Sequence, residues 1–137
     1  RIMNFVNGPI KGYVHAAFRI AFGLMFFTNG AAKLFGWFGR GEAVDLMSRM
    51  GVAGVLETFG GLLIMLGLFT RPTAFIVSGQ MAVAYFWIHG DRGLWWWANG
   101  GERAAMSSWA FLLLAAIGAG AYSLDEWIAK RRAIPAE

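Results

Sequence analysis

The sequence predicts an all-α integral membrane protein, a four-helix transmembrane bundle with both termini in the cytoplasm. Its 137 residues are 58% hydrophobic and only 15% charged, whereas soluble domains carry about 25% charged residues. Four apolar segments are long enough to cross a hydrocarbon core of about 30 Å as helices. Cysteine is absent, which excludes disulfides and thiolate metal sites. We therefore expect one multi-pass domain over residues 1–137.

The predicted spans cover approximately residues 13–35, 51–69, 73–89 and 103–122. The second and third are separated only by "TRPT", where Arg71 marks a water boundary and Pro72 suits a first helical turn. These two spans must form a tight antiparallel hairpin. The third is close to the minimum length for crossing, which is about 17 residues.

The orientation follows from the lysine and arginine residues that flank the spans. One flank holds Arg1, Lys11, Arg71, Lys130, Arg131 and Arg132, and the other holds Lys33, Arg40, Arg49, Arg92 and Arg103 together with most of the neighbouring acidic residues. Both termini are therefore predicted to be cytoplasmic. Although the net charge is +4, the basic residues are scattered, so a nucleic-acid partner is not expected. The cluster at residues 130–132 indicates an anchor to anionic lipid headgroups.

Several polar residues lie in the outer half of the predicted bundle. Asn29 and Lys33 are four residues apart and share a helix face, and Glu57, Tyr85 and His89 come from the next two spans. One interpretation is a proton-relaying or ligand-polarising site, in which Lys33 holds the Glu57 carboxylate and the other side chains bond a carbonyl or hydroxyl. The alternative is an ion pair that only sets helix register. No second metal ligand accompanies the histidine, so neither zinc nor haem is expected.

Three further polar residues have structural interpretations. Arg19 and Asp125 lie towards the inner end, where a pair between them would join the first and last spans; alternatively, Asp125 meets water or Arg71. Gln80 lies near the middle of the third span. It must find a partner within the bundle, because an unpaired amide in hydrocarbon costs several kcal/mol, roughly 2–7.

The segment "WWWANGGER" is predicted to form an outer loop between the third and fourth spans. Trp95, Trp96 and Trp97 are interpreted either as an interfacial belt or partner contact, or as a lid over Lys33 and Glu57. Tryptophan suits the interface because its ring is apolar and its N–H reaches water or headgroups. Asn99 and two glycines supply the turn. Glu102 and Arg103 begin the last helix.

These residues, taken in order, resemble the DoxX family of small four-helix membrane proteins. The resemblance extends from about residue 13 to residue 125. Its features are Arg19, Gly30, "KLF" from Lys33, Glu57 leading into "GGLLIMLGLFTR", His89, "NGGE" from Asn99, and "GAGAYSLD".

The resemblance implies a bacterial inner-membrane protein linked to membrane redox systems. One relative is the DoxD subunit of a thiosulfate:quinone oxidoreductase, and another group associates with sulfur-transfer and superoxide-defence proteins. Since this chain has no cysteine, any thiol needed for thiosulfate chemistry would come from a partner.

Three functions are consistent with these observations. We expect an accessory or anchoring subunit that contacts other membrane or periplasmic redox subunits, because the chain has no cofactor motif and no autonomous catalytic motif. The alternative is a quinone-binding component that uses Lys33, Glu57 and His89 for proton exchange. A small-molecule carrier is least favoured, because no inverted repeat or broken span is evident.

Overall fold

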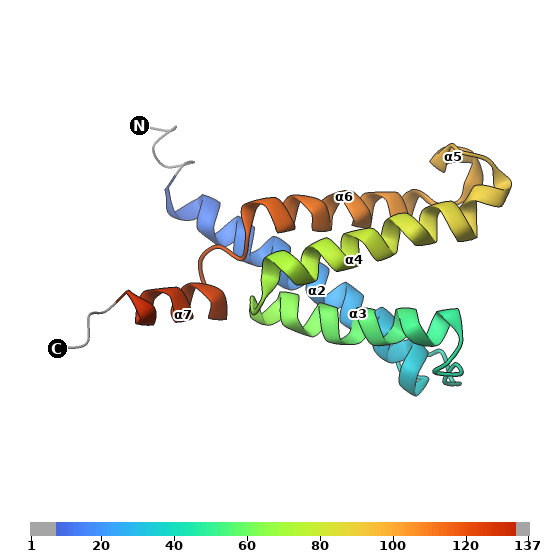
Figure 1. Cartoon of the computed structure of the whole chain (residues 1–137), viewed down its shortest axis with the longest axis horizontal. Coiled ribbons are helices and arrows are strands. Elements are labelled where there is room, and N and C mark those ends of the chain that lie inside the picture. Colours follow the sequence, from blue (N-terminus) through green and yellow to red (C-terminus); the bar gives the residue numbers. More distant parts are fainter. Residues whose placement is uncertain (1–7, 134–137) are drawn as a thin grey trace.

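The computed structural model describes residues 8–133, and this part of the chain is helical, with no strand. This confirms the predicted all-α class. Arg1, placed in the cytoplasmic flank by the sequence, lies outside the described residues. The helices are α2 (Pro9–Phe35), α3 (Arg49–Leu66), α4 (Thr70–Ala84), α5 (Trp96–Asn99), α6 (Glu102–Ile117) and α7 (Leu124–Arg132), with a π-helical turn η1 (Tyr85–His89) and a 3-10 turn η2 (Gly90–Arg92). Figure 1 shows α5 and α7 at opposite ends of the long helices.

Helices α2 and α3 pack at very short range because glycines on both helices face each other. A Cβ atom on Gly61 would lie 2.6 Å from the Gly23 carbonyl oxygen and would also collide with the Phe27 backbone nitrogen. One on Gly30 would lie 2.7 Å from the Gly54 carbonyl oxygen. Small residues allow this approach between apolar helices.

Gly61→Ala is expected to force α2 and α3 apart and to lower the free energy of unfolding by about 1–3 kcal/mol, the usual cost of overpacking. Gly79→Ala in α4 is the matched control, since a Cβ there meets nothing within 4 Å. Unfolding of both variants in mixed detergent measures the difference. Equal stability of the two variants would contradict the close approach.

A single apolar core joins the two helix pairs, α2 with α3 and α4 with α6. Its buried members come from all four helices: Phe26, Ile64, Ala74, Val77, Phe111 and Leu114. Phe26 and Phe111 meet edge to face with ring centroids 4.5 Å apart. Between α4 and α6, the Ser78 hydroxyl donates to the Ser108 carbonyl at 2.7 Å, and the Ser108 hydroxyl donates back at 3.0 Å. Packing and hydrogen bonds therefore fix the position of α4 along α6.

The predicted hairpin forms, with its turn at residues 67–69, slightly before "TRPT". Gly67 follows the last residue of α3 and caps it in a left-handed conformation with φ of 67°, and Pro72 lies in the first turn of α4. The α4 helix passes into η1, so helical structure continues from Thr70 to His89. This end agrees with the expected end of the third span.

The fourth predicted span is too long at its C-terminal end. Helix α6 stops at Ile117 instead of continuing to Tyr122, because Gly118 and Gly120 have φ of 79° and 70°. The next segment runs without regular structure into α7, which Ser123 caps by accepting from the Glu126 backbone N–H.

Within residues 8–133, two helices have the length and apolar character needed to cross a membrane. They are α2 and α3.

Candidate functional site

A charged pair joins α2 and α3 in the interior of the helical assembly. The Lys33 ammonium lies 2.8 and 2.7 Å from the two carboxylate oxygens of Glu57. Glu57 is only 4% exposed, while the Lys33 side chain is 20% exposed. Both groups carry the formal charges needed to neutralise each other, so the geometry keeps a carboxylate in an apolar region without leaving it unpaired.

Gln80 extends this pair into a triad with α4. Its amide nitrogen donates to the Glu57 Oε1 atom at 3.2 Å, whereas its Oε1 atom is buried without a hydrogen-bond partner. The sequence required a partner for Gln80 but did not identify Glu57, which lies in another span. The two residues lie at a similar depth when residues are counted from the ends of their spans, and this similarity is the sequence signal that links them. We call Lys33, Glu57 and Gln80 the polar triad.

Within residues 8–133, Glu57 bonds Lys33 and Gln80 and forms no hydrogen bond with the other three predicted site residues. Asn29 is exposed on α2. The Tyr85 hydroxyl donates to the Leu94 carbonyl, and His89 Nδ1 lies 3.2 Å from the Asn99 carbonyl oxygen. Tyr85 and His89 therefore hold the loop that follows η1. That Tyr85 and His89 hydrogen-bond a carbonyl or hydroxyl of a bound molecule beside Glu57 stays a prediction.

Asn99 is the buried centre of this loop. Its side-chain nitrogen donates to the Gly93 carbonyl at 2.9 Å, and its oxygen accepts from the Gly101 backbone N–H at 2.7 Å. Gly101 packs on the Tyr85 ring, where an added Cβ would come within 2.8 Å of two ring carbons. Glu102 and Arg103 are exposed at the start of α6. Of Asn99, Glu102 and Arg103, only Asn99 forms side-chain hydrogen bonds within the described part of the loop.

The three tryptophans stand on the surface of the loop. Trp95 and Trp97 stack with ring centroids 4.9 Å apart and an interplanar angle of 11°, and Trp96 meets both rings at steep angles. Trp95 is 52% exposed and Trp97 is 68% exposed. Their exposed faces and mutual contacts favour an interfacial belt or partner contact over a lid on the polar triad.

Comparison with known proteins assigns the family. A sequence model of DoxX matches residues 14–90, more than half of the chain. The chain belongs to the DoxX family. An uncharacterized protein from Haemophilus influenzae is 42% identical over 129 residues, covering 88% of this chain and 95% of the relative. The inner membrane protein YqjF of Escherichia coli is 34% identical over 125 residues, covering 82% and 90% of the two chains. No solved structure matches.

This DoxX protein is thus a membrane protein, as the composition predicts. The DoxX match contains all three members of the polar triad, together with Tyr85 and His89. It ends at Gly90, before the tryptophans and before the turn at residues 118–123. The polar triad therefore belongs to the part of the chain that defines the family, and the outer loop lies beyond it.

At the other end of the DoxX fold, Arg19 binds backbone carbonyls. The side chain is 1% exposed, and its guanidinium donates to the carbonyls of Ala119 and Tyr122, each at 2.7 Å. A weaker contact reaches Ala121 at 3.4 Å. Of the alternatives for Asp125, an ion pair with Arg19 within 4 Å does not form, because the guanidinium binds the carbonyls of the irregular segment after α6.

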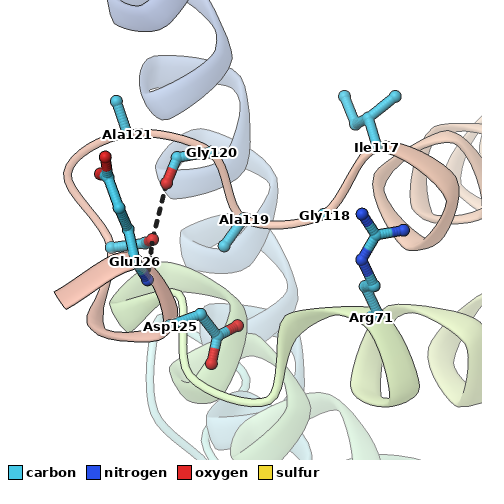
Figure 2. A pocket seen from close by; sticks show the side chains of 9 residues that line it. Arg71, Ile117, Gly118, Ala119, Gly120, Ala121, Asp125 and Glu126 are labelled. Atoms are coloured by element: carbon cyan, nitrogen blue, oxygen red, sulfur yellow. Dashed lines mark hydrogen bonds between the residues drawn. The ribbon is translucent and has the colours of Figure 1, made fainter. Parts of the chain in front are cut away.

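Asp125 instead caps the start of α4. Its two carboxylate oxygens accept from the backbone N–H groups of Phe69 and Thr70, each at 2.9 Å. Arg71 does not contact Asp125 but donates to the Ala116 carbonyl at 2.6 Å. Figure 2 shows Arg71 reaching towards the end of α6 while Asp125 points towards the start of α4. Both side chains satisfy helix ends, which is a structural role.

Proposed function

We propose that this DoxX protein is an accessory subunit of a redox assembly in the bacterial inner membrane. The observation that carries the proposal is the rigid presentation of Trp95 and Trp97 on an exposed loop. Tyr85, His89 and Asn99 fix that loop from within. Exposed aromatic side chains in a fixed geometry are the usual anchors of protein interfaces, and they lose little conformational entropy on binding.

The polar triad supports the same proposal. Both oxygens of Glu57 already accept hydrogen bonds from protein groups. A carboxylate engaged in this way sets the register of α2, α3 and α4, and it has less freedom to exchange protons with a bound molecule. We assign the triad a structural role within the subunit.

The proposal includes four membrane crossings with both termini in the cytoplasm. Helices α2 and α3 have the required length and apolar character. The α4–η1 segment continues to His89, and at about 1.5 Å per residue it reaches the length of a span. Helix α6 shares the apolar core with the other three. The arginine and lysine distribution supports the orientation, and the name of the Escherichia coli relative supports the inner membrane.

Purification from native membranes in mild detergent tests the accessory role. We expect a second polypeptide at fixed stoichiometry that carries a redox cofactor visible in its absorption spectrum. The Trp95→Ala/Trp97→Ala variant should lose this partner, because the stacked pair provides the contact. Trp109→Ala is the control, since Trp109 is 72% exposed and lies on α6, outside the loop. Recovery of the unaltered chain alone would contradict the proposal.

A quinone-binding role is the second candidate, favoured by one observation. The Gln80 Oε1 atom is buried without a donor, and a quinol hydroxyl would supply one beside Glu57. In the same preparation, Glu57→Gln should abolish quinol-linked electron transfer under this second candidate while leaving the protein inserted and folded. Retained electron transfer in Glu57→Gln would rule it out and leave the accessory role.

A further inference from the structure

A groove lies between α2, the end of α3 and α7, far from the tryptophan loop. Its volume is about 830 Å³. Most of its lining is apolar, supplied by Ile20, Met65, Leu66, Leu124 and Trp127. Ile20, Leu66 and Trp127 are exposed by 45%, 47% and 52%. We call this space the α7 groove, and its floor offers a hydrocarbon chain an apolar surface.

Basic side chains border the α7 groove, together with the carboxylate of Glu126. Arg19 lines it, and Arg19 has no carboxylate within 4 Å among residues 8–133. Its hydrogen bonds go to neutral carbonyls, and the carboxylate that interacts with its charge from a longer distance is that of Asp125. On the α7 side, Lys130 pairs with Glu126 at 3.0 Å, and both line the groove. The Arg131 guanidinium lies 4.3 Å from the centroid of the Trp127 ring.

The groove lies where headgroups meet the helices. Leu66 is the last residue of α3, and α2 and α3 are the two helices with the character of membrane spans. A groove at the end of α3 therefore opens at the boundary between hydrocarbon and water. Tryptophan and basic residues at this depth are typical of contacts with lipid headgroups.

We propose that the α7 groove binds one acidic phospholipid. The acyl chains lie on the apolar floor, and the phosphodiester faces the exposed basic side chains of Lys130 and Arg131, whereas Arg19 is buried beneath the groove. A zwitterionic lipid would bring its own cation to this site and would gain less from it. The proposal rests on the membrane placement of α2 and α3 and is independent of the accessory role.

Native mass spectrometry of the purified full-length chain in detergent tests this site. Phosphatidylglycerol and phosphatidylcholine with identical acyl chains are added in equal amounts, and the retained lipid is counted. We expect one phosphatidylglycerol per chain, retained about fivefold or more over phosphatidylcholine, because each nearby base contributes to the attraction of an acidic headgroup. Lys130→Gln/Arg131→Gln should abolish most of this preference.

Two further variants separate headgroup recognition from general attraction. Leu66→Gln alters the exposed floor and should lower retention of both lipids. Arg40→Gln/Arg92→Gln removes two exposed bases from the opposite end and should leave the preference unchanged. Equal retention of the two lipids by the unaltered chain, or an equal loss of preference in Arg40→Gln/Arg92→Gln and Lys130→Gln/Arg131→Gln, would overturn the proposal.

Discussion

Replacing Lys33 with methionine is expected to lower the free energy of unfolding by about 3–5 kcal/mol, the cost of leaving one member of a buried ion pair unpaired. Glu57 is 4% exposed, so water would replace little of the interaction that its carboxylate loses with Lys33. Gln80 alone supplies one hydrogen bond at 3.2 Å. Unfolding in mixed detergent, followed by circular dichroism, measures the loss.

The double variant Lys33→Met/Glu57→Leu provides the control for this prediction. Removing both charges should recover most of the lost stability, because an apolar pair of similar volume replaces the ion pair. Recovery should remain incomplete, since Gln80 then loses its acceptor. If Lys33→Met alone were as stable as the unaltered chain, the pair would not contribute to the packing of α2 against α3.

Replacing Arg19 with methionine should have an effect of similar size at the other end. Two hydrogen bonds from the guanidinium, both 2.7 Å long, would be lost, and bonds to charged groups contribute about 1.5–3 kcal/mol each. The sum predicts destabilisation of about 3–6 kcal/mol. The segment 118–123 should also become accessible to proteases, because Arg19 fixes its carbonyls.

Two other substitutions calibrate the Arg19 prediction. Arg19→Lys should retain part of the stability, since an ammonium can reach only a subset of the carbonyls that the planar guanidinium joins. Arg71→Met removes an exposed arginine that also binds a carbonyl, and it should cost about 0.5–1.5 kcal/mol. If Arg19→Met and Arg71→Met lowered the free energy of unfolding equally, the burial of Arg19 would contribute nothing to stability.

The sequence predicts much of the helical arrangement because apolar length and flanking charge act locally. The hairpin at residues 67–69 and the meeting of Lys33 with Glu57 follow from counting depth along each helix. The residue at which a helix ends is harder to predict from the sequence than the presence of the helix. "IGAGAY" reads as apolar and therefore as helix, although Gly118 and Gly120 take positive φ and free the carbonyls that Arg19 binds.

The outer site was less predictable for a related reason. A π-helical turn at residues 85–89 changes the direction of Tyr85 and His89, and helical spacing of four residues does not reveal such a turn. The Asn99 backbone carbonyl contacts His89, and the Asn99 side chain holds the loop at Gly93, while Tyr85 binds the Leu94 carbonyl. Residue type identified these side chains as polar groups at the membrane edge, but only the path of the backbone determined their partners.

The most direct test of the accessory role is a density map of the protein purified from its native membrane. We expect a second polypeptide seated against Trp95 and Trp97, with the side chains of Lys33, Glu57 and Gln80 in contact with one another. Density for an elongated ligand between Glu57 and Gln80, in a particle that contains this chain alone, would contradict it.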